Sequence, residues 1–60
     1  MMEKYMKELD AMMKEIRARG LMKEIHRHAK EYGLNHDAAY WHGVVKTILY
    51  FNGDKRWCEE

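Results

Sequence analysis

The sequence predicts an all-α fold, a small bundle of three helices that forms a single domain over residues 1–60. Apolar residues recur at helical spacing along most of the chain, and strand-like alternation is absent. Glycines interrupt this pattern, and the chain contains no proline. Sixty residues provide for one small core. The resulting helices are expected near residues 2–19, 21–32 and 36–52.

The first expected helix carries a continuous apolar stripe. At about 100° per residue, seven apolar side chains fall on one arc. These are Met2, Tyr5, Met6, Leu9, Met12, Met13 and Ile16. Five of the six methionines of the chain lie within its first thirteen residues, so this face can adapt its shape to a neighbour. We expect it to enter a core, either within one chain or shared with a second copy.

A break at Gly20 separates the first helix from the second. The second stripe consists of Leu21, Met22, Ile25, Ala29 and Tyr32. On one uninterrupted helix the two stripes would point about 165° apart, whereas a break lets both face the same core. The pairs Gly20-Leu21 and Gly33-Leu34 match a helix that ends at a left-handed glycine, with the next apolar residue folded back on the last turn.

The third segment has features of both a helix and a hairpin. Residues 44–51 are rich in β-branched and aromatic side chains, and Asn52-Gly53 is typical of a hairpin turn. The apolar residues nevertheless fill about half of a helical circumference. Asn35 suits the helix N-cap, and Gly53 can end the helix. We therefore favour a helix over 36–52, with a β-hairpin at 44–58 after a helix-turn-helix as the alternative.

One side of this third helix is a candidate protein-binding surface. Ala39 and Gly43 are four residues apart on its polar side, where small side chains let another element approach closely. In this phase Tyr40, Trp41 and Val44 face the core, and His42 faces outward. A tyrosine beside basic and small residues is typical of an interface. The predicted surface consists of Ala39, His42, Gly43, Lys46 and Tyr50.

Basic residues gather in the middle of the chain. Residues 14–30 contain six basic and two acidic residues, although the whole chain has a net charge of only +1. Lys23, Arg27 and Lys30 follow i, i+4, i+7 spacing and therefore form one exposed stripe on the second helix. We expect this stripe to steer an acidic partner protein towards the binding surface.

The alternative function is DNA binding, because residues 29–35 match the centre of a helix-turn-helix. Ala29, Gly33 and Leu34 are followed by Asn35 as the cap of a recognition helix. In that register Ala39 and His42 would face the core. The side chains facing DNA would be Asn35, His36, Asp37, Tyr40 and Trp41. Residues 34–60 contain three basic and four acidic residues, so this half offers few phosphate contacts, and we rank DNA binding second.

Metal binding and catalysis receive little support from the sequence. The four histidines include no i, i+4 pair, and no CxxC or HExxH motif occurs, so we expect no metal and no cofactor. Cys58, the single cysteine, lies too near the chain end to be held in a catalytic pair. We therefore expect a protein that is not an enzyme.

The chain also lacks the apolar runs that direct proteins to membranes. No stretch of about 18 apolar residues is present, and the N-terminal residues do not form a signal-peptide core. Together with the single thiol, this indicates the cytoplasm. Trp57 either anchors a partner or folds back on the core. The sequence as a whole predicts a non-catalytic protein-binding module, an intracellular regulator, inhibitor or adaptor that acts alone or as a dimer.

Overall fold

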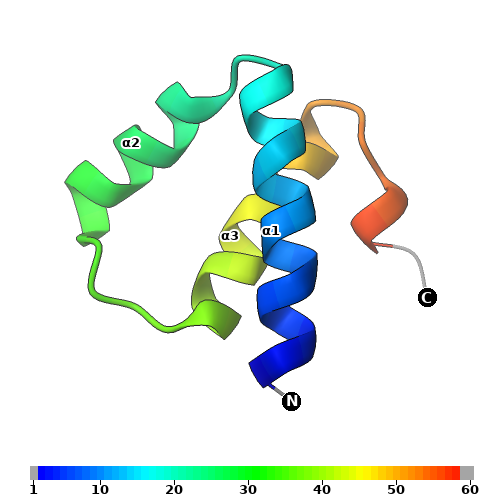
Figure 1. The fold of residues 1–60 in the computed structure, drawn as a ribbon. Coiled ribbons are helices and arrows are strands. Elements are labelled where there is room, and N and C mark those ends of the chain that lie inside the picture. The colour runs from blue at the N-terminus through cyan, green and yellow to red at the C-terminus, as the bar shows by residue number, and fades with distance from the viewer. Residues whose placement is uncertain (1, 59–60) are drawn as a thin grey trace.

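The computed structural model describes residues 2–58, and these residues form three α-helices, a short 3₁₀-helix and no strand. Figure 1 shows their arrangement. Both ends of each α-helix lie within two residues of the expected positions. The all-α prediction is confirmed, and the alternative hairpin at 44–58 is wrong. The elements are α1 (Met2–Ala18), α2 (Met22–Tyr32), α3 (Ala38–Phe51) and η1 (Arg56–Cys58).

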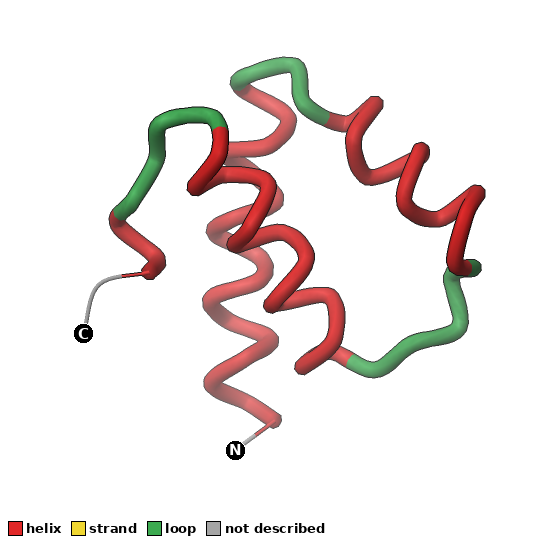
Figure 2. The backbone as a smooth tube through the Cα atoms, turned by 180° about the vertical axis from the view of Figure 1, so that it is seen from behind, coloured by secondary structure: helices red, strands yellow, loops and turns green. Residues whose placement is uncertain are grey.

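The core lies mainly between α1 and α3, which cross each other in both views of the chain (Figures 1 and 2). Met12 and Ile16 of α1 meet Val45 and Leu49 of α3, and all four are fully buried. Helix α2 contributes Ile25 and diverges from this pair along most of its length. The stripe predicted for the first helix is therefore buried at Met12 and Ile16 and partly exposed towards its N-terminal end. The side chain of Met2 lies outside the described part of the chain.

The break between α1 and α2 follows the predicted glycine chemistry. Gly20 has a φ of +71°, and its N–H donates to the Arg17 carbonyl at 3.1 Å. The Leu21 N–H donates to the Ile16 carbonyl at 2.9 Å, which completes a Schellman motif. Leu21 packs against the core, so separate first and second helices are confirmed.

The chain departs from this pattern between α2 and α3. Gly33 ends α2 with a φ of +89°, but its ψ of 169° is extended and leads the chain away from the last turn. Leu34 is consequently 73% exposed, and the prediction that it folds back is wrong. Asp37, not Asn35, is the N-cap of α3, because its side chain accepts a 2.9 Å hydrogen bond from the Tyr40 N–H.

A second Schellman motif ends α3 at the pair that suggested a hairpin. Gly53 has a φ of +95°, and the Asp54 N–H donates to the Leu49 carbonyl at 2.9 Å. The buried Asp54 carboxylate accepts hydrogen bonds from Arg56 at 2.7 and 2.9 Å and lies 3.5 Å from Arg19. These contacts hold η1 in place. Trp57 of η1 packs against the core, which is the second of the two positions predicted for it.

The first testable prediction concerns the Asp54 ion pair. Hydrogen bonds from Arg56 hold the pKa of Asp54 well below its ordinary value. The resulting stabilisation is complete above the unfolded-chain pKa of about 3.9 and decreases as the pH falls below it. In urea titrations between neutral and acidic pH, Asp54→Asn should be less stable than the parent chain at neutral pH. This difference should shrink in acid.

Asp10→Asn is the matched control, because Asp10 is an exposed carboxylate on α1. Its substitution should leave the acid-dependent loss of stability almost unchanged. A constant stability difference between the parent chain and Asp54→Asn at every pH would contradict the assigned role of the Asp54 carboxylate.

Candidate functional site

A groove of about 610 Å³ between α2 and α3 is the candidate functional site. Its volume falls in the range of ligand sites, which is about 300–1,000 Å³. One wall is formed by a face of α2, with Glu24, Arg27, His28, Glu31 and Tyr32. The floor is formed by a face of α3, with Tyr40, Gly43, Val44, Thr47 and Ile48.

The composition of α3 makes this open groove unusual. The helix has 14 residues, of which only Lys46 is a lysine, arginine, aspartate or glutamate. A helix with so few charged side chains is normally covered over most of its circumference. Here His42, Val45 and Leu49 are buried. Figure 2 shows that no element of residues 2–58 lies over the side of α3 that faces the viewer.

Exposed aromatic residues continue this open side at the end of α3. Phe51 is 78% exposed, and it follows Val44 and Thr47 at the i+7 and i+4 positions that share one helix face. Tyr50 is 41% exposed, and its ring meets that of Phe51 edge-on at 5.6 Å. The groove therefore ends beside two large, solvent-accessible rings.

Gly43 leaves the middle of the groove floor without a side chain. A glycine inside a helix costs about 1 kcal/mol relative to alanine. A Cβ built on Gly43 would meet no atom within 4 Å, so no neighbouring helix requires a glycine at this position. The effect of the glycine within the described chain is to widen the groove.

At its other end the groove has a cluster of aromatic rings that hold one another in place. The Tyr40 hydroxyl hydrogen-bonds with His28 Nε2 at 2.7 Å, and the His36 ring stacks on Tyr40 with centroids 3.8 Å apart. His36 Nε2 donates to the Tyr32 carbonyl at 2.9 Å. Because these rings already hold one another, their side chains lose little conformational freedom when an occupant binds against them.

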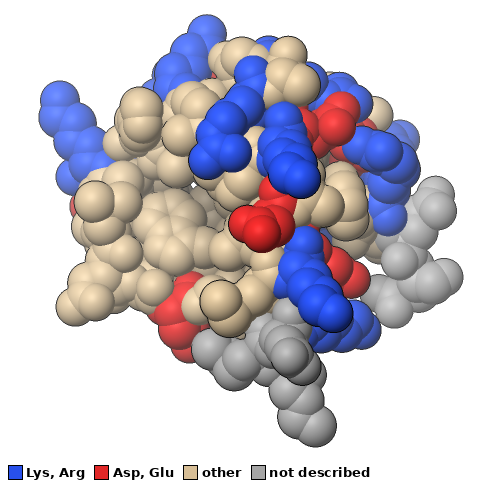
Figure 3. Space-filling view, in the orientation of Figure 1, with Lys and Arg blue, Asp and Glu red and all other residues tan. Residues whose placement is uncertain are grey.

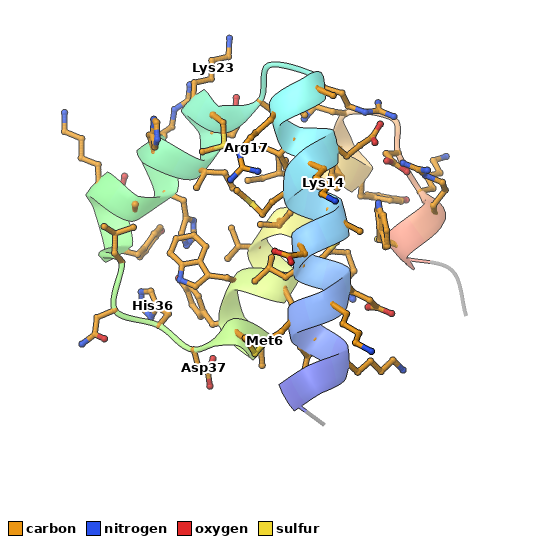
Figure 4. The ribbon with its side chains drawn as sticks, in the orientation of Figure 1. Met6, Lys14, Arg17, Lys23, His36 and Asp37 are labelled. Atoms are coloured by element: carbon orange, nitrogen blue, oxygen red, sulfur yellow. The ribbon has the colours of Figure 1, made fainter. Side chains whose placement is uncertain are left out.

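The structure distributes the predicted site residues over three places. Gly43 and Arg27 line the groove, while Ala39 and Tyr50 are exposed on α3. Lys46 is half-buried. Lys23, Arg27 and Lys30 are all on α2, but Lys23 and Lys30 do not line the groove, and Lys23 points away from the molecule in Figure 4. Arg27 lies 3.4 Å from Glu24.

His42 corrects the predicted orientation of the third helix. It is 8% exposed, so the prediction that it faces outward is wrong. Its Nε2 hydrogen-bonds with Glu8 Oε1 of α1 at 2.7 Å, and this bond lowers the pKa of Glu8. Tyr5 covers the imidazole edge-on at 5.0 Å. A polar side chain can be buried between two helices when it has such a hydrogen-bond partner. The residues next to His42 in the sequence did not indicate that Glu8 would be this partner.

Four of the five residues assigned to DNA in the helix-turn-helix register, all except Asn35, already have intramolecular contacts. Asp37 caps α3, Tyr40 bonds with His28, and Trp41 packs against the core. Of the two residues expected in the core, His42 is buried and Ala39 is exposed.

A smaller hollow of about 240 Å³ lies on the face between α1 and α2. Figure 3 shows uncharged surface there, bordered by basic and acidic side chains. Figure 4 places Lys14 and Arg17 beside it on α1, with Met6 nearer the N-terminus. Its lining is entirely apolar and consists of Leu9, Met13, Ile25, Leu34, Trp41 and Val45.

Comparison with protein families, curated proteins and solved structures found no match to this chain. Among the described residues, no three histidine, cysteine, aspartate or glutamate side chains are arranged to hold a metal ion. No helix of residues 2–58 has the length and apolar character needed to cross a membrane. The geometry of the groove is thus the main evidence bearing on function.

The second testable prediction concerns the two glycines that bound the last half of α3. Gly43→Ala should stabilise the chain by about 0.5–1 kcal/mol, because the helix gains propensity and the new methyl meets open space. Gly53→Ala is the contrasting variant and should destabilise the chain by about 1 kcal/mol, because its φ is +95°. Urea unfolding followed by circular dichroism measures both. A destabilised Gly43→Ala variant would show that Gly43 is needed for packing.

Proposed function

We propose that this chain is a non-catalytic protein-binding module that holds a segment of its partner in the groove between α2 and α3. The observation that carries the proposal is the apolar character of α3, which has a single lysine among its 14 residues and an open side along this groove. Covering that side with protein removes apolar surface from water, which is the main driving force of association.

The groove lining has the residue types that protein interfaces favour. Tyrosine and arginine are enriched at interfaces, and here Tyr32, Tyr40 and Arg27 lie on one continuous surface. Tyrosine provides a large contact area with few rotatable bonds. Glu24 partly neutralises Arg27 at 3.4 Å, so the centre of the groove favours an apolar segment. The basic residues Lys23 and Lys30 lie outside this contact and are not required by the proposal.

The third testable prediction places a photo-crosslinking amino acid at Thr47, an exposed residue of the groove floor. In cells that express the chain, irradiation should produce covalent adducts with a protein, since the probe then lies within the contact. The matched control carries the probe at Lys7, a residue of α1 that does not line the groove. It should give few adducts.

A filled groove provides the second half of this test. Gly43→Leu adds bulk to the floor, and leucine is a better helix former than glycine, so the variant should fold and lose the Thr47 adducts. Gly43→Ala adds only a methyl and should retain most of them. Equal adduct yields from Thr47 and Lys7, or adducts that persist in Gly43→Leu, would refute binding in this groove.

A further inference from the structure

We infer that the occupant of the α2–α3 groove is a second copy of this chain, packed antiparallel with α3 against α3 about a twofold axis at Thr47. This inference rests on the proposed function, because it identifies the protein that the groove would bind.

Size complementarity along one face of α3 is the first argument. Gly43 and Phe51 each lie four residues from Thr47, on the same face of the helix. When two such helices run antiparallel about Thr47, Phe51 of each copy comes opposite Gly43 of the other. Phe51 is 78% exposed, and a methyl group added at Gly43 would meet no atom within 4 Å. A large ring therefore meets a gap that accepts it.

The residue on the proposed axis is suited to a close helix contact. The Thr47 hydroxyl donates to the Gly43 carbonyl of its own helix at 2.8 Å, so its hydrogen-bonding need is met before association. Burying this side of Thr47 against its counterpart then leaves no hydroxyl unpaired.

Charge does not oppose the pairing of two α3 helices. Lys46 is the only lysine or arginine in the helix, and aspartate and glutamate are absent from it. Lys46 is half-buried and does not line the groove. The open side of α3 therefore presents no like charges to its own copy, and the α2 wall of the groove carries both signs of charge, with Glu24, Arg27 and Glu31. The contact is thus not one between two surfaces of the same sign.

The contact also closes after two copies. In a twofold arrangement the same surface is used on both chains, so each Phe51 fills one groove and neither copy keeps a free one. A partner with unrelated sequence would have to supply its own aromatic side chain, whereas this chain already carries one at the matching distance. Helical rise places Gly43 and Phe51 about 12 Å apart, and the antiparallel copy reproduces the same separation.

The fourth testable prediction concerns the oligomeric state of the full chain. Analytical ultracentrifugation over a wide concentration range should show a monomer–dimer equilibrium. Phe51→Ala and Gly43→Leu should each raise the dimer dissociation constant at least about tenfold, as expected for residues at the centre of an interface. Leu34→Ala is the matched control, since Leu34 is about as exposed as Phe51 but does not line this groove. It should leave the constant unchanged.

Exchanging the bulky and small positions tests the geometry directly. The double variant Gly43→Leu with Phe51→Ala moves the side chain from one helix position to the other, and it should recover much of the dimer lost in either single variant. Circular dichroism of every variant verifies that the helices are retained.

A disulfide provides an independent measure of the axis. In a Cys58→Ser background, Thr47→Cys should form a symmetric disulfide dimer under mild oxidation. Ala39→Cys should not, because two copies of residue 39 would be about 24 Å apart along antiparallel helices. This result depends on proximity alone and not on changes in affinity.

The outcomes of these experiments separate the two proposals. A monomer at every concentration overturns the second copy as the occupant, and adducts between Thr47 and a different protein would then leave the proposed function in place. A dimer that is indifferent to Gly43→Leu, Phe51→Ala and their combination also overturns this inference, because another surface would be responsible. The absence of both dimer and Thr47 adducts overturns both proposals.

Discussion

The fold depends on the apolar contact between α1 and α3. Met12, Ile16, Val45 and Leu49 are the fully buried side chains of this contact, and they come from helices that are far apart in sequence. Because one side of each helix is used here, α2 is left to pack through Ile25 and the aromatic residues around His28. The groove follows from this unequal arrangement, since α2 covers only part of the remaining surface of α3.

Local chemistry made the helices predictable, whereas the rotation of α3 required tertiary information. Gly20 and Gly53 end helices through left-handed backbone conformations that few other residues adopt, so their roles could be read from neighbouring residues. His42 could not be placed in this way. Its burial depends on Glu8, which is 34 positions away in the sequence and supplies the missing hydrogen-bond partner.

The candidate site was predictable to the same extent. Gly43 stood out in the sequence as a small residue inside a helix, and Arg27 as part of an exposed basic stripe. That both line one groove depends on the placement of α2 relative to α3, two helices joined by a segment that begins at Gly33. The extended ψ at this glycine directs the chain away from α2 before Asp37 starts the next helix, and no residue pattern specified that angle.

Under the proposed function, Gly43 connects the stability of the free chain with binding. A glycine inside a helix costs about 1 kcal/mol of stability relative to alanine. This is a substantial fraction of the free energy of unfolding of a typical small domain, which is about 5–15 kcal/mol. No atom of the described chain needs the space that the glycine leaves. An occupant that fills this space gains contacts that are absent from the free chain, so the loss can be recovered in the bound state. Gly43→Leu, which replaces glycine with a better helix former, would then weaken the complex without weakening the free helix, and the two effects together distinguish a binding groove from a packing defect.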